Sequence, residues 1–88
     1  MRDLETLKEK YLLINELDLV NELTTLVIWT NYKDNPTETM ANVLEEIAEI
    51  EIDEKILVEA QEYEIAIIAK SERLMFGKIY KEMLKMSN

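Results

Sequence analysis

The chain has 88 residues, with 19 acidic and 10 basic side chains, a formal net charge of −9, and neither Cys nor His. This length fits one small domain over residues 1–88, and the absence of Cys excludes a disulfide framework and thiolate metal sites. Without His, the commonest general base and transition-metal ligand are missing, so we expect no enzyme, no catalytic residues, no metal and no cofactor. No apolar run approaches the roughly 18 residues that span a membrane, and the mixed-charge N-terminus lacks a signal-peptide pattern, which favours a cytoplasmic protein.

The charge is distributed unevenly along the chain. Residues 1–36 contain four basic and seven acidic side chains, residues 37–66 contain one and ten, and residues 67–88 contain five and two. An acidic middle followed by a basic end indicates either internal neutralisation or two separate surfaces for partners.

Two helices are expected before residue 35. Asp3 can cap the first, whose apolar residues recur at helical spacing: Leu4, Leu7, Tyr11 and Ile14. The apolar pattern shifts at Asn15. Asn15 and Asp18, flanked by Ile14 and Leu19, have the spacing of a helix N-cap with a hydrophobic staple, which predicts a bend at this point. The second helix runs toward Tyr32, although the segment 24–30 is rich in β-branched residues and also has strand propensity. This second helix has no polar face, and we expect that it is buried on both sides.

A loop and a strong helix start follow. Residues 32–35 are expected to be a loop, and Asn35, Pro36 and Glu38 combine a capping side chain, a proline at the first helical position and a glutamate three residues after the cap. The third helix is predicted from Pro36 to about Ile50, with a short connector over 51–53. Its apolar arc is expected to face inward: Met40, Val43, Leu44, Ile47, Ala48 and Ile50.

The segment Asp53 to Ala69 is predicted to be a central helix capped by Asp53. Its apolar residues form two strips, one with Ile56, Ala60, Tyr63 and Ile67 and the other with Leu57, Val58, Ile65, Ile68 and Ala69. A helix with two apolar faces needs neighbours on both sides. Residues 50–53 and 63–67 also alternate with the period of strands, but one Gly and one Pro provide few turns for a sheet.

Lys70 to Arg73 leaves two possibilities for the end of the chain. Either the central helix continues, or Ser71 begins another helix. In a continuous helix Glu72 falls within the apolar strip, where a buried unpaired carboxylate is costly, so it needs a partner or solvent. The predicted fold class is all-α, a small bundle of four or five helices completed by oligomerisation, with a homodimer expected.

Acidic side chains gather on one side of the third helix. They form a candidate partner-binding face: Glu38, Glu45, Glu46 and Glu49. A solvated face is the simpler interpretation. A hard-cation site would need a wider acidic cluster, whose spacing matches neither a calcium-binding loop nor a His-containing di-iron bundle: Glu45, Glu46, Glu49, Glu51, Asp53 and Glu54. As a docking surface, this face would attract a basic partner.

The C-terminal segment carries two further candidate surfaces. One is basic and consists of Lys70, Lys78, Lys81 and Lys85, which suits phosphate contact, although no aromatic residue interleaves with them. The opposite side is a candidate oligomer or partner interface, or simply core: Met75, Phe76, Ile79 and Met83. Trp29 and Tyr32 are either an exposed anchor for a partner or core residues.

These patterns predict a small acidic protein-interaction module. We expect it to bind and inhibit or modulate a protein partner, and a basic partner would match its acidic face. By analogy with small acidic proteins of mobile elements, it suits an inhibitor, antitoxin or immunity role. The alternatives are a nucleic-acid-associated regulator that uses the basic C-terminal helix, and a structural homo-oligomer. Nucleic acid and membrane are not the expected partners.

Overall fold

A computed structural model of the chain describes residues 3–16 and 18–87, and this part of the chain is almost entirely helical. Four helices follow one another: α1 (Leu4–Glu16), α2 (Asp18–Asp34), α3 (Pro36–Glu59) and α4 (Tyr63–Ser87). No strand occurs within the described residues, so the predicted all-α class is confirmed. None of the described helices combines the length and the apolar composition that crossing a bilayer requires.

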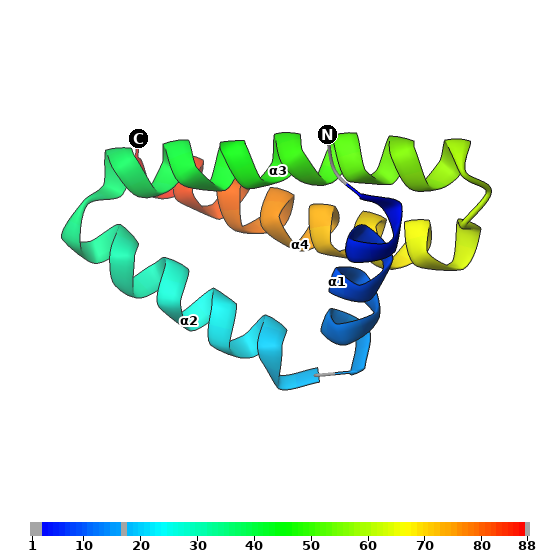
Figure 1. Cartoon of the computed structure of the whole chain (residues 1–88). Coiled ribbons are helices and arrows are strands. Elements are labelled where there is room, and N and C mark those ends of the chain that lie inside the picture. The colour runs from blue at the N-terminus through cyan, green and yellow to red at the C-terminus, as the bar shows by residue number, and fades with distance from the viewer. Residues whose placement is uncertain (1–2, 17, 88) are drawn as a thin grey trace.

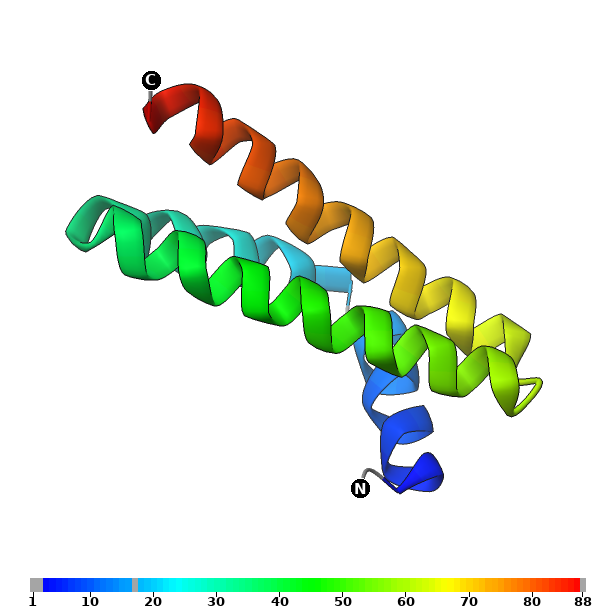
Figure 2. The same cartoon turned by 90° about the horizontal axis from the view of Figure 1, so that it is seen from above.

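The two long helices, α3 and α4, form an antiparallel hairpin, and the other two lie on one side of it (Figure 1). The helices of the hairpin are close at the turn over residues 60–62 and diverge toward the opposite end (Figure 2). Helix α2 runs back along α3, while α1 covers the end of the hairpin near the turn (Figure 1). The molecule measures 41 × 23 × 20 Å.

The start of α3 confirms the predicted cap. The Asn35 side-chain oxygen accepts a hydrogen bond from the Glu38 backbone N–H at 3.2 Å, and its amide donates to the Glu38 carboxylate at 3.0 Å. This reciprocal pair satisfies one of the unpaired N–H groups at the helix start. The expected loop over residues 32–35 is wrong, because α2 continues to Asp34 and leaves Asn35 alone between two helices. Tyr32 is buried, which holds this last turn of α2 against the core.

The predicted central helix is also wrong. Helix α3 continues through the expected connector to Glu59, and the segment Asp53 to Ala69 is divided by a turn over residues 60–62. Gln61 adopts the left-handed conformation with φ 63°, its N–H bonds to the Val58 carbonyl at 3.0 Å, and the Glu62 N–H bonds to the Leu57 carbonyl at 2.8 Å. These two bonds make a Schellman helix end, in which Gln61 occupies the position that glycine usually takes.

Helix α2 forms despite its β-branched residues, as predicted. The hydroxyls of Thr25 and Thr30 donate to the carbonyls of the residues four positions earlier, at 2.7 and 2.8 Å, so neither competes with the helix for its N–H groups. The expected burial on both sides is wrong, because Leu23, Leu26 and Val27 are exposed.

The chain changes direction between α1 and α2, close to the predicted bend, but the predicted N-cap at Asn15 is wrong because Asn15 lies within α1 (Figure 1). Helix α1 ends at Glu16 and α2 begins at Asp18. The predicted contact between Ile14 and Leu19 involves a side chain outside the described part of the chain. At the other end of the molecule, α4 runs through Lys70 to Arg73 without a break, so the continuous helix is the correct alternative.

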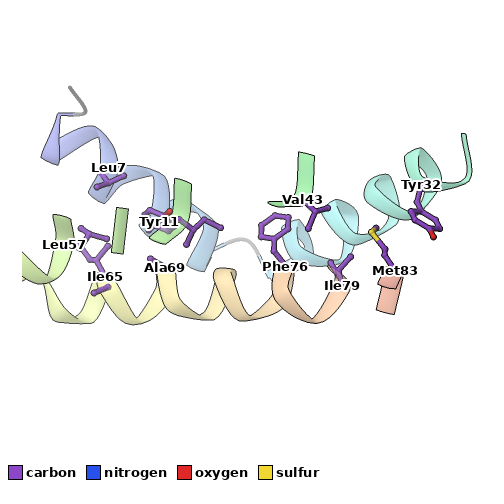
Figure 3. Packing of buried hydrophobic residues seen from close by; sticks show 12 residues of the cluster. Leu7, Tyr11, Tyr32, Val43, Leu57, Ile65, Ala69, Phe76, Ile79 and Met83 are labelled. Atoms are coloured by element: carbon purple, nitrogen blue, oxygen red, sulfur yellow. The ribbon is translucent and has the colours of Figure 1, made fainter. Parts of the chain in front are cut away.

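The buried apolar side chains form one cluster along the hairpin, with a group near the turn and a group toward the open end (Figure 3). Near the turn they are Leu7, Tyr11, Leu57, Ile65 and Ala69, and toward the open end they are Tyr32, Val43, Phe76, Ile79 and Met83. Helix α1 contributes to the first group and α2 to the second. Each short helix thus covers one half of the hairpin.

Candidate functional site

The outer face of α3 carries an exposed apolar strip. Its members are spaced three and four residues apart and therefore lie on one side of the helix: Ala41, Leu44, Ala48 and Ile52. Leu44 is 45% exposed and Ile52 is 59% exposed. The expectation that the whole apolar arc of this helix faces inward is therefore wrong. Val43 and Ile50 are buried, and the other side of the arc meets solvent.

The predicted acidic face borders this strip. Glu38, Glu45 and Glu49 are exposed and project along one edge of it at helical spacing, and Glu51 lies on the other edge. We call the apolar strip and these four acids the α3 outer face. Glu46, the fourth acid of the predicted set, is exposed but lies further around the helix, where it lines a cavity.

The second predicted interface lies largely inside the molecule. Phe76, Ile79 and Met83 are buried in the chain's own core, and Met75 is half-buried against it. This placement fits the core alternative, and an interface role for these four residues stays a prediction.

Trp29 and Tyr32 are likewise part of the packing. Their rings meet edge to face with centroids 5.5 Å apart, Tyr32 is buried, and Trp29 packs half-buried against the core. The core alternative describes Tyr32 correctly. Trp29 keeps an exposed part on α2.

The basic face of α4 is solvent-exposed. Lys70, Lys78 and Lys81 lie on its outer side, together with Ile67 and Leu74, which are 64% and 57% exposed. Lys85 is also exposed and lies 4.0 Å from the Glu82 carboxylate on the same helix.

Arg73 has a different role from these lysines, because it joins α4 to α3. Its Nε donates to a Glu54 carboxylate oxygen at 2.8 Å, and its Nη2 lies 3.5 Å from the other oxygen. This hydrogen bond to Glu54 raises the pKa of Arg73 above its usual value. Some of the basic charge at the C-terminal end is thus neutralised by α3 within the chain.

A cavity of about 380 Å³ lies among the four helices, beside the central part of the hairpin. It is partly open to solvent and has walls from all four helices. Its lining is mixed, with apolar side chains from every helix and polar ones between them: Lys10, Tyr11, Ile14, Thr24, Ile28, Asn31, Thr39, Asn42, Val43, Glu46, Ile50, Glu72 and Phe76.

Glu72 contributes a buried carboxylate to this cavity. Its side chain comes from the middle of α4 and is only 7% exposed. Burial raises its pKa above the ordinary value of 4.5, while a hydrogen bond from the Asn21 amide and the charge of Lys10 oppose the increase. The sequence indicated this site only through a carboxylate within an apolar strip.

Asp53 is a second buried carboxylate, and the sequence assigned it the wrong role. It lies in the middle of α3 rather than capping a helix, and it is fully buried. The Tyr11 hydroxyl donates to its Oδ2 at 2.6 Å, and the Lys10 ammonium lies 3.6 Å from the same oxygen. Lys10 also lies over the Tyr11 ring, 5.1 Å from its centroid. These contacts connect α1 to α3.

Within residues 3–16 and 18–87, no cluster of three or more carboxylates is close enough together to hold a metal ion. Comparison of the chain with protein-family models, curated proteins and solved structures finds no match. We therefore infer function from the surfaces and the cavity of the chain itself.

Proposed function

We propose that this chain is a small acidic interaction module that binds a protein partner through the α3 outer face and thereby inhibits or modulates that partner. The observation that carries the proposal is the exposed apolar strip of Ala41, Leu44, Ala48 and Ile52 with carboxylates along both edges. An amphipathic helix with apolar anchors at this spacing suits an apolar groove in another protein.

The carboxylates indicate the character of the partner. Glu38, Glu45, Glu49 and Glu51 border the strip, so a groove with basic residues at its rim matches both the apolar and the charged parts of this face. The net charge of −9 adds long-range attraction to such a partner and increases the rate of encounter. The apolar anchors then hold the complex after the charges have guided its formation.

A homodimer is compatible with the same surfaces. The outer side of α4 presents Lys70, Lys78 and Lys81 around exposed Ile67 and Leu74, which complements the α3 outer face of a second copy in both charge and apolar character. The same lysines support the alternative of a nucleic-acid-associated regulator, and a homodimer without another partner would be a structural oligomer.

Matched variants of α3 and α4 test the proposal. Leu44→Ser with Ile52→Ser removes the two large exposed anchors of the α3 outer face, and Ile67→Ser with Leu74→Ser makes the same kind of change on α4. Because all four side chains are exposed, both double variants should fold with stabilities close to that of the parent chain. Each is used to capture partners from the native host's lysate, with and without nuclease.

The α3 double variant should lose the captured protein, and the α4 double variant should retain it. A third variant, Glu38→Gln with Glu45→Gln and Glu49→Gln, should slow association with the purified partner, more at low salt than at high salt. Loss of the partner from the α4 variant alone, or after nuclease treatment, would contradict the proposal and favour the basic face instead.

A further inference from the structure

We propose that the cavity among the four helices binds a small organic cation, an amine with an apolar body, whose ammonium group pairs with the Glu72 carboxylate. This site is separate from the α3 outer face. It rests on the volume of the cavity, its apolar walls and the placement of its charged groups.

The size and walls of the cavity suit a small molecule. Its volume of about 380 Å³ lies at the lower end of the range for ligand sites, roughly 300–1,000 Å³. Apolar walls come from Ile14 of α1, Ile28 of α2, Val43 and Ile50 of α3 and Phe76 of α4. An aromatic or aliphatic body would be surrounded by side chains of all four helices.

The charges of the lining favour a cation over an anion. The acidic and basic side chains that line the cavity are Glu46, Glu72 and Lys10. Two carboxylates thus face one ammonium, and that ammonium lies 3.6 Å from the buried Asp53 carboxylate behind it. An anionic ligand would approach two carboxylates, whereas an ammonium group would neutralise excess negative charge.

Glu72 is the group best placed to recognise the cation. It is 7% exposed, it lines the cavity, and its hydrogen bond from the neutral Asn21 amide provides less charge compensation than an ion pair. A ligand ammonium would supply a charge-assisted hydrogen bond in a partly desolvated site. Asn31 and Asn42 also line the cavity and offer amide groups for further polar contacts.

Three probes of similar shape test this assignment on the full chain: 2-phenylethylamine, 2-phenylethanol and phenylacetate, which are cationic, neutral and anionic at neutral pH. Each is titrated into the isotopically labelled protein, and backbone amide shifts are followed by NMR. We expect saturable shifts at residues that line the cavity, with the amine binding at least about tenfold more tightly than the alcohol and the anion binding most weakly.

Two variants locate the charge recognition. Glu72→Gln keeps the shape of the side chain and should remove the preference for the amine over the alcohol. Glu46→Gln changes the other carboxylate, which is solvent-exposed. It should weaken binding of the amine by a smaller factor than Glu72→Gln does. Glu64→Gln makes the same charge change at an exposed position in the first turn of α4, outside the cavity, and should leave all three affinities unchanged.

Several results would overturn the proposal. These are the absence of saturable shifts for the amine into the millimolar range, a preference for phenylacetate, or an unchanged preference for the amine in folded Glu72→Gln or, if that variant does not fold, unchanged binding of the amine in Glu46→Gln. Melting curves of the variants show whether each is folded, and Glu46→Gln keeps the test decisive if Glu72→Gln is not. Loss of the protein partner from the α3 double variant would leave this inference unaffected, because the two sites lie on different sides of α3.

Discussion

Two buried carboxylates on facing helices of the same hairpin have different surroundings. Asp53 of α3 is fully buried, accepts a 2.6 Å hydrogen bond from the Tyr11 hydroxyl and has the Lys10 ammonium 3.6 Å away. Glu72 of α4 is 7% exposed, lines a cavity, and has the Asn21 amide as its hydrogen-bond donor. Burial raises the pKa of Glu72 above its ordinary value.

This contrast shows how a small helical protein can use a buried carboxylate either for structure or for recognition. A buried charge is tolerated when its partners belong to the fold, and it then fixes the position of the element that supplies them. At Asp53 the partners come from α1, so the contact attaches α1 to the hairpin. At Glu72 part of the surroundings is a cavity, so a partner from outside can complete them.

Removing the hydroxyl of Tyr11 should have the largest effect. Tyr11→Phe keeps the ring but leaves the Asp53 carboxylate without its short hydrogen bond in a fully buried position. A hydrogen bond to a charged group contributes about 1.5–3 kcal/mol, so we expect a loss of that size in the free energy of unfolding. Urea denaturation measures it.

Tyr63→Phe is the matched control, because Tyr63 is 57% exposed at the start of α4. Its free energy of unfolding should change by less than about 0.5 kcal/mol. Equal effects of the two substitutions would mean that the Asp53 contact does not stabilise the fold and that the two carboxylates do not differ in the way described above.

Removing the charge of Lys10 should have a smaller effect. Its side chain is 43% exposed, so its interaction with Asp53 is partly screened and Lys10→Met should cost at most about 1 kcal/mol. The same substitution should raise the pKa of Glu72 further, because the charge of Lys10 lowers that pKa. An NMR titration of the Glu72 side-chain carbon measures this increase, and Lys70→Met, at an exposed position on α4, is the control.

The sequence predicted those features that depend on local chemistry. The cap at Asn35 and the start at Pro36 follow from side chains that bond to their own helix, and the structure confirms both. The helix end at residues 60–62 has the same kind of local hydrogen bonding, but Gln61 occupies the left-handed position instead of Gly. Nothing in the local sequence marks this turn, which is why Asp53 to Ala69 read as a single helix.

The candidate sites depend on tertiary packing, and the sequence predicted them only in part. Helical spacing groups Glu38, Glu45, Glu46 and Glu49 on one side of α3, but Glu46 lines the cavity. Periodicity shows that Leu44 belongs to the apolar arc of its helix. Which part of this wide arc contacts a neighbour depends on where the other helices lie. The cavity has walls from four helices, so no single segment encodes it. Glu72 was its one local signal, as a carboxylate that needed a partner.

Removing the charge of Glu72 should stabilise the protein near pH 7, whereas the substitutions at Tyr11 and Lys10 should destabilise it. Burial raises the pKa of Glu72, so the folded protein keeps this proton to a higher pH than the unfolded chain does. The stability associated with Glu72 is therefore fully present below the ordinary carboxyl pKa of 4.5 and is lost as the pH rises through the raised value. The neighbouring groups in this titration are Lys10 of α1, Asn21 of α2 and Glu46 of α3.

Glu72→Gln should remove this loss, because glutamine stays neutral and can still accept a hydrogen bond from the Asn21 amide. The variant should melt at the same temperature as the parent chain below pH 4.5 and at a higher temperature near pH 7, with the difference increasing between these limits. Glu64→Gln, which removes an exposed carboxylate from the same helix, should show little difference from the parent at any pH. Melting temperatures of the parent chain and both variants, measured across this pH range, test the prediction. If Glu72→Gln is less stable than the parent near pH 7, the carboxylate is stabilised by its surroundings in the fold, as Asp53 is, and needs no partner from outside.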